Sequence, residues 1–151
     1  MSGAGPAKAL ALLTSAQAAL RARFDDLRRA LDRRDETACR LAIGDFHDHL
    51  RAWTAAEEEA LLPAVERTGV PGRDPRRELL TEYNQLRELT AHVRRQIESG
   101  GSRADVLGFL ENLARRLAAH ERGNLEAYYP AAAGRLRDGE LRALEAAAPP
   151  P

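Results

Sequence analysis

Four stretches of this chain carry apolar residues at alternating steps of three and four. That spacing places side chains on one face of an α-helix and leaves the opposite face polar. The four stretches are residues 10–31, 43–65, 79–97 and 106–128. Helices of this kind must bury their apolar faces against one another, so the pattern predicts an all-α protein.

The segments between these stretches contain residues that end one helix and begin the next. Gly69 and Gly100-Gly101 suit left-handed helix ends, whereas Asp74-Pro75 and Ser102 suit helix starts. We therefore predict an up-down-up-down four-helix bundle. Its turns are expected near residues 32–36, 68–74 and 99–102.

A length of 151 residues favours one domain with a core of its own. We expect a flexible N-terminus over residues 1–6 and the bundle over 7–134. Pro130 and Gly134 are expected to end the fourth helix. The remaining residues, 135–151, predict a short helix over 138–148 followed by a proline-rich tail.

The composition excludes several classes of partner. Formal net charge is zero and the charges are interleaved, so no basic field invites nucleic acid. No apolar stretch is long enough to span a membrane, and the N-terminal apolar run is too short for a secretory signal. Cys39 is the only cysteine, which excludes an intrachain disulfide and fits a reduced, cytoplasmic setting. We expect a monomer or a homodimer.

Residues that do not belong in an apolar core interrupt each helical face. They are Gln17 in the first stretch, Trp53 and Glu57 in the second, Tyr83 in the third, and His120 and Asn124 in the fourth. A helix rises about 1.5 Å per residue, so Gln17 and Trp53, each about 17 residues from the first turn, share a height. Tyr83 and His120, about 16 and 17 residues from the third turn, share one too. The sequence therefore predicts a polar site inside the bundle.

Each of these residues also has a purely structural interpretation. A core glutamine or histidine is commonly satisfied by a neighbour, and Trp53 and Tyr83 are large side chains that fill space. Glu57 is the hardest to explain in this way, because glutamate is rarely buried without a partner. It also belongs to the run Glu57-Glu58-Glu59, which could face solvent.

Two segments resemble a known family. Residues 46–63, FHDHLRAWTAAEEEALLP, and residues 120–130, HERGNLEAYYP, are similar to the second and fourth helices of hemerythrin-like, HHE cation-binding domains. The resemblance covers nearly the whole chain, including helix order and length. It implies a four-helix bundle and non-haem iron binding, usually at a carboxylate-bridged di-iron centre that serves oxygen or iron sensing.

Most of the family's metal-ligand positions are substituted in this chain. Glu57 and His120 match the family. The positions that differ are Gln17, Trp53 and Tyr83 in place of histidines, and Asn124 in place of a carboxylate. Iron favours imidazole and carboxylate donors, whereas an indole offers no lone pair and an amide oxygen is weak. The resemblance therefore predicts the fold and argues against the family's usual metal chemistry.

The leading hypothesis is a degenerate metal site that has become a metal-free pocket for a small organic molecule, without a cofactor. Glu57, His120 and Tyr83 are the candidates for acid/base catalysis. Ligand contacts are expected from Gln17, Trp53, Asn124 and Arg87. In one alternative, Glu57, His120 and Tyr83 bind a single metal ion, iron. In the other, the bundle is structural and acts through its surface.

Overall fold

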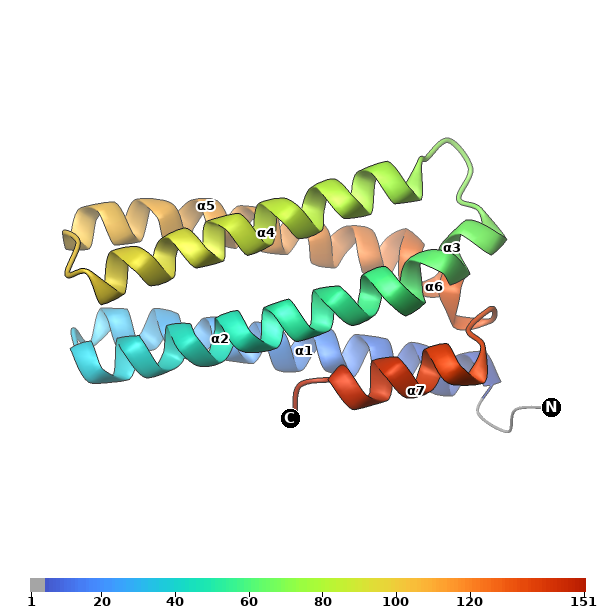
Figure 1. Ribbon diagram of the computed structural model, residues 1–151, viewed down its shortest axis with the longest axis horizontal. Coiled ribbons are helices and arrows are strands. Elements are labelled where there is room, and N and C mark those ends of the chain that lie inside the picture. Colours follow the sequence, from blue (N-terminus) through green and yellow to red (C-terminus); the bar gives the residue numbers. More distant parts are fainter. Residues whose placement is uncertain (1–4) are drawn as a thin grey trace.

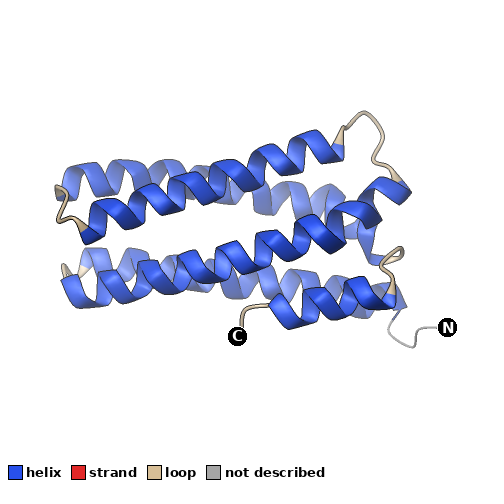
Figure 2. Cartoon of the chain, in the orientation of Figure 1, coloured by secondary structure: helices blue, strands red, loops and turns tan. Residues whose placement is uncertain are grey.

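The computed structural model describes residues 5–151, and these residues contain no β-strand (Figures 1 and 2). Four long helices run antiparallel to their sequence neighbours (Figure 1). They are α1 (Gly5–Asp32), α2 (Glu36–Ala56), α4 (Pro75–Glu98) and α5 (Arg103–Gly123). The all-α bundle is as the sequence predicts, with turns at residues 33–35, 69–74 and 99–102.

Two of the four arms continue beyond their long helix. After α2 come a π-helical turn, η1 (Glu57–Leu61), and α3 (Leu62–Thr68). After α5 come a second π-helical turn, η2 (Asn124–Tyr128), and α6 (Tyr129–Ala133). The last helix, α7 (Asp138–Ala147), packs across α1, α2 and η1 and buries Leu144 (Figure 1).

The ends of the bundle differ from the sequence prediction in two places. Part of the expected flexible N-terminus, residues 1–4, lies outside the described residues, whereas Gly5 and Pro6 belong to α1. Pro130 does not end the fourth arm, which continues to Ala133. In the π-helical turn before it, the Tyr129 N–H donates to the Asn124 carbonyl. Pro130 then occupies the first turn of α6, where a missing N–H costs little.

Side-chain caps begin three of the four long helices. Asp35, Asp74 and Ser102 each accept a hydrogen bond from a backbone N–H three residues later, at 3.0, 3.2 and 3.1 Å. The caps at Asp74 and Ser102 are those that the sequence predicts. By satisfying the free N–H groups at the helix starts, they fix where each arm enters the bundle.

The apolar faces of the four arms meet in one continuous core. Its largest fully buried side chains include Phe24, Phe46 and Trp53 and the tyrosines Tyr83, Tyr128 and Tyr129. No helix within residues 5–151 has the length and hydropathy to span a bilayer.

Candidate functional site

The six residues that interrupt the apolar faces lie together inside the bundle. Their exposed fractions are 7% for Gln17, 2% for Trp53, 0% for Glu57, Tyr83 and Asn124, and 5% for His120. They come from α1, α2, η1, α4, α5 and η2, so all four arms contribute. The rise per residue, counted from the turns, therefore correctly predicted that these six residues lie at one level of the bundle.

Asn124 lies at the centre of the cluster. Its amide nitrogen is 3.1 Å from Gln17 Oε1, 3.2 Å from His120 Nε2 and 3.5 Å from Glu57 Oε2. An amide nitrogen carries only two hydrogens, so it cannot donate to all three partners at once. The shortest contact links the first and fourth arms directly.

His120 lies between two carboxylates from different helices. Its Nδ1–H donates to Glu82 Oε1 at 2.5 Å, while Nε2 is 3.5 Å from Glu57 Oε1. Burial alone would lower the pKa of His120. The hydrogen bonds and charges of Glu57 and Glu82 outweigh burial and raise that pKa to about 9. His120 is therefore predominantly an imidazolium at neutral pH.

The Nε2 atom of His120 has partners for both of its protonation states. When Nε2 carries a proton, the Glu57 carboxylate stabilises it from 3.5 Å. When Nε2 is bare, it accepts a hydrogen bond from the Asn124 amide at 3.2 Å. The site can therefore hold or release one proton without leaving this nitrogen unsatisfied.

Two site residues were missed by the sequence prediction. Glu82 directly precedes Tyr83, which was a predicted site residue. Its contact with His120 depends on how α4 crosses α5, and the sequence does not reveal that crossing. Tyr129 is fully buried beside Trp53, Glu57 and Asn124. Its position on the apolar side of the fourth arm depends on η2, which no sequence signal predicted.

Four buried polar atoms of the site have no hydrogen-bond partner among the described residues. They are Glu57 Oε1, Asn124 Oδ1 and the hydroxyl groups of Tyr83 and Tyr129. Burial and the negative charge of Glu57 raise the pKa values of both tyrosines well above the usual range. Both phenols therefore stay neutral. The site thus contains several buried polar atoms that form no hydrogen bond with the described residues.

The cavity inside the cluster is very small, about 10 Å³. A space of roughly this size holds a single water molecule, whereas sites for organic ligands span roughly 300–1,000 Å³. The predicted organic-ligand pocket among Trp53, Glu57, Tyr83 and His120 is therefore wrong in size. Aromatic and leucine side chains pack too closely, and Tyr83 does not line the cavity.

Arg87, which the sequence predicts to contact the ligand, lines neither the core cavity nor the outer pocket between α4 and α5. Its Nε donates to Thr54 Oγ1 at 3.0 Å and its Nη2 to Glu58 Oε2 at 3.2 Å. The guanidinium carbon lies 5.8 Å from the centre of the Tyr83 ring. Arg87 therefore covers the outer side of Tyr83, between α2 and α4.

The two π-helical turns begin at site residues. In η1 the Leu62 N–H donates to the Glu57 carbonyl, and in η2 the Tyr129 N–H donates to the Asn124 carbonyl. A π-helical turn adds one residue to a helical turn and so changes which side chains face inward after it. Such turns occur frequently at functional sites, and here both lie at the polar cluster.

The donors of the site do not suit a metal ion. No group of three or more His, Cys, Asp or Glu side chains within residues 5–151 is arranged to hold one. Only Glu57 and His120 are strong donors in the core, and both ring nitrogens of His120 already have partners.

A larger pocket lies on the other side of His120, between α4 and α5. Its volume is about 160 Å³, and its lining residues are Glu82, Gln85, Leu86, Arg116, Ala119 and His120. The Glu82 side chain is 33% exposed. The His120 ring thus separates a core cavity the size of one water from an outer pocket that admits a small molecule.

The sequence model of the hemerythrin HHE cation-binding domain matches residues 8–133. Comparisons with curated proteins and with solved structures gave no match. The matched range covers all four arms of the bundle and every residue of the polar cluster. The chain therefore belongs to the hemerythrin family of HHE cation-binding domains.

Proposed function

We propose that this chain is a metal-free member of the hemerythrin family that performs acid/base chemistry on a small polar molecule. The degenerate metal site keeps Glu57 and His120 and uses them to hold a proton. The molecule binds in the outer pocket between α4 and α5, not in the core cavity. The observation that carries the proposal is the placement of His120 between Glu57 inside and Glu82 at the outer pocket.

In this proposal Glu82 is the group that exchanges a proton with the bound molecule. It is partly exposed, lines the pocket and accepts a hydrogen bond from His120 Nδ1 at 2.5 Å. His120 orients that carboxylate and neutralises its charge as the imidazolium. The Nδ1 proton of His120 passes to Glu82 when Glu82 has given its own proton to the bound molecule, and Glu57 stabilises the Nε2–H of the ring from the core.

The size of the outer pocket limits the class of molecule. The pocket volume of about 160 Å³ is far larger than the core cavity but lies below the roughly 300–1,000 Å³ of sites for drug-sized ligands. Arg116 and Gln85, joined by a 2.7 Å hydrogen bond, add polar groups at the rim, while Leu86 and Ala119 add apolar surface. The fitting ligand is a polar molecule of a few non-hydrogen atoms.

The family implies a bound cation, and the donor set argues against one here. Two strong donors remain of the family's ligand positions, and hydrogen bonds within the protein engage both ring nitrogens of His120. The proposed chemistry therefore involves side-chain protons and no metal ion.

The test is a ligand-observed NMR screen of polar molecules of a few non-hydrogen atoms, the size that the pocket of about 160 Å³ admits. Ala119 is exposed and lines the pocket, so Ala119→Trp should block it without disturbing the core. Binding should be lost in that variant and kept in Ala118→Trp, at a neighbouring exposed position that does not line the pocket.

Molecules that bind are then followed in D2O for proton exchange and product formation. Glu82→Gln and His120→Gln should each lower the rate by about 10²-fold or more, the range for a positioned acid or base. The proposal is wrong if no molecule binds, if Ala119→Trp leaves binding unchanged, or if bound molecules exchange protons at the same rate with both variants.

A further inference from the structure

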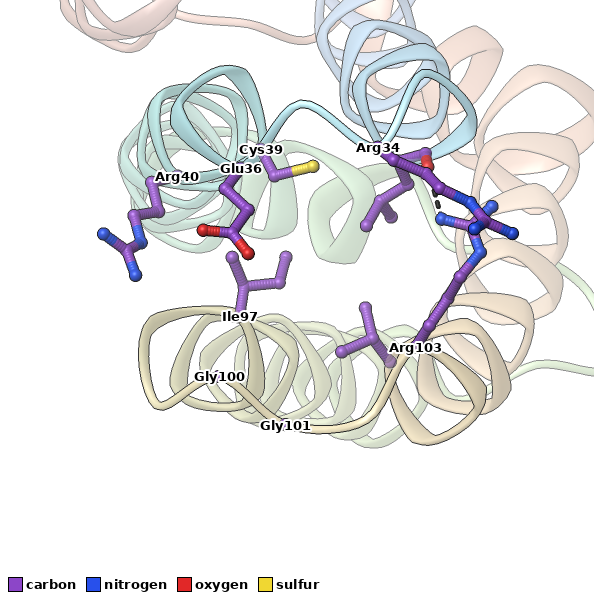
Figure 3. A pocket seen from close by; sticks show the side chains of 10 residues that line it. Arg34, Glu36, Cys39, Arg40, Ile97, Gly100, Gly101 and Arg103 are labelled. Carbon is purple, nitrogen blue, oxygen red and sulfur yellow. Dashed lines mark hydrogen bonds between the residues drawn. The ribbon is translucent and has the colours of Figure 1, made fainter.

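A hollow that combines charge with an apolar wall lies far from the polar cluster. It lies at the end of the molecule where the α1–α2 turn meets the α4–α5 turn (Figures 1 and 3). Its volume is about 380 Å³, within the range of roughly 300–1,000 Å³ typical of sites for organic ligands. Neither the family match nor the proposed acid/base chemistry uses it.

One side of this end cavity is apolar. Leu31 and Val106 contribute side chains that are 7% and 4% exposed, and Ile97 adds a partly buried one. Cys39 is 6% exposed, and its thiol points into the hollow (Figure 3). Burial and the nearby Asp35 raise the pKa of this thiol. The thiol therefore stays uncharged and lines the cavity without acting as a nucleophile.

The other side carries positive charge. The guanidinium groups of Arg34 and Arg103 border the cavity, and neither residue forms an ion pair within residues 5–151. Figure 3 shows the guanidinium groups of Arg34 and Arg103 on the same side of the hollow, with Arg40 directed away from it. Arg103 donates to the Leu31 carbonyl, which holds its guanidinium in place. Glu36 is the single acidic side chain of the lining, so positive charge is in excess.

The position of Arg34 is unusual for this residue type. At the end of α1, the Asp35 N–H donates to the Ala30 carbonyl and the Arg34 N–H to the Leu31 carbonyl, which is the Schellman pattern. This pattern requires a left-handed residue, and Arg34 has φ 55°. Glycine is the preferred residue there, because a side chain is strained in that region.

The same motif ends α4 at the same end of the bundle, with the preferred residue. There the Gly101 N–H donates to the Gln96 carbonyl and the Gly100 N–H to the Ile97 carbonyl, and Gly100 has φ 73°. Two equivalent turns therefore flank the cavity, one with glycine and one with a strained arginine. Strained backbone positions cluster at ligand-binding and active sites, which singles out Arg34 as a candidate binding residue.

We propose that the end cavity binds a small organic anion, a monocarboxylate with an apolar body. Its carboxylate contacts the Arg34 and Arg103 guanidinium groups, which suit planar anions. Its apolar part lies along Leu31, Ile97 and Val106. Opposed helix ends meet here, so their dipoles largely cancel, and the arginines supply the attraction.

The test uses octanoate as the probe and 1-octanol as the uncharged molecule of equal chain length. Isothermal titration calorimetry with the full chain should show octanoate binding at one site and octanol binding at least about tenfold more weakly, as expected from the loss of charge-assisted hydrogen bonds. Backbone NMR should place the shift changes at Cys39, Ile97 and Arg103. Ile97→Trp, which fills the hollow, should abolish binding.

Arg34→Gly separates binding from folding. It should raise the melting temperature, because glycine relieves the left-handed strain, and weaken octanoate binding at least about tenfold. Arg34→Lys should keep part of the affinity. Arg40→Gln is the matched control for general positive charge and should change binding less than about twofold, since Arg40 points away from the cavity.

Three results would overturn the proposal. The first is equal affinity for octanoate and octanol, which would make the hollow a merely apolar cavity. The second is an equal loss in Arg34→Gly and Arg40→Gln, which would reduce the effect to general charge attraction. The third is binding that persists in Ile97→Trp, or no octanoate binding to the folded wild-type chain.

Discussion

Neighbouring charges decide the protonation of His120 against the effect of burial. A histidine buried in an apolar core would lose its proton, yet Glu57 and Glu82 hold the proton in place from two sides. This arrangement contributes to the free energy of unfolding, because the pKa of His120 is higher in the folded chain than in the unfolded chain. The stability of the protein must then depend on pH through this residue.

His120 should make the protein less stable in alkali. The pKa of His120 is about 9 in the fold and 6.5 for the ordinary side chain, so the stabilisation is complete below pH 6.5 and is lost as pH rises through 9. Urea unfolding between pH 6 and 9.5 should show a free energy of unfolding that falls by up to about 1.4 kcal/mol per pH unit.

The His120→Gln variant should lack this part of the pH dependence. His49→Gln is the control, because His49 is a partly exposed histidine outside the site and its removal should leave the slope unchanged. An identical pH profile for wild type and His120→Gln would show that the two carboxylates do not hold the proton as the geometry indicates.

The tyrosine hydroxyl groups of this core should differ in their contribution to the free energy of unfolding. The Tyr83 hydroxyl is buried and has no hydrogen-bond partner among residues 5–151, whereas the Tyr128 hydroxyl donates to Glu78. Tyr83→Phe should leave the free energy of unfolding unchanged or raise it by up to about 1 kcal/mol, because an unsatisfied group is removed. Tyr128→Phe should lower it by about 1 kcal/mol, because a hydrogen bond is lost.

Thermal and urea unfolding of the two variants measures this difference directly. If Tyr83→Phe proved as destabilising as Tyr128→Phe, the Tyr83 hydroxyl would have a partner, and an ordered water in the core cavity would be the first explanation to test.

At the scale of elements, the π-helical turns and the helix ends place the site. Both η1 and η2 lie immediately before a Leu-Pro or Tyr-Pro step, at Pro63 and Pro130. Each turn shifts the hydrogen-bond register so that the proline falls in the first turn of the next helix. The arms therefore continue past their prolines, and Glu57 and Asn124 stand where the register changes.

Two glycines should respond with opposite signs to alanine. Gly100 ends α4 with φ 73°, so Gly100→Ala should lower the free energy of unfolding by about 1–2 kcal/mol. Gly108 lies inside α5, and an added methyl group would meet nothing within 4 Å. Gly108→Ala should therefore raise it by about 0.5–1 kcal/mol.

Chemical denaturation of both variants at one pH measures the sign of each change in the free energy of unfolding. The same sign for the two changes would mean that backbone strain does not distinguish the end of α4 from the middle of α5, contrary to the Schellman geometry at Gly100.

At the scale of the whole molecule, a family built around a metal keeps its bundle here with few metal donors. The family model matches residues 8–133, a range that holds nearly all of the four arms and the turns between them. The Asn124–Gln17 hydrogen bond links the fourth arm to the first, and the His120–Glu82 hydrogen bond links the fourth arm to the third. These hydrogen bonds add to the packing of the apolar core that holds the four arms together.

Protein purified without added metal should contain well under one iron per chain and lack di-iron absorption bands, because only Glu57 and His120 remain as strong donors. Restoring donors at the four substituted positions should raise iron affinity and produce those bands. The combined variant carries Gln17→His, Trp53→His, Tyr83→His and Asn124→Glu.

The control is the same combined variant with His120→Ala, which should bind iron more weakly. Stoichiometric iron in the wild-type chain, lost on His120→Ala, would contradict the metal-free proposal and favour a mononuclear site.

The sequence by itself determined the bundle, its turns and the level of the polar cluster. Helical periodicity and constant rise per residue are local properties, so counting from the turns brought Gln17, Trp53, Tyr83 and His120 to one height. Caps such as Ser102 work through atoms three residues away and are equally local.

Only the tertiary structure decided what surrounds each polar group and how much space remains. The Glu82–His120 bond depends on how α4 crosses α5, and the cavity of about 10 Å³ depends on how four arms interdigitate. The end cavity with Arg34 and Arg103 joins turns that are far apart in the chain. Distances of this kind follow from packing between helices, which periodicity along one helix does not encode.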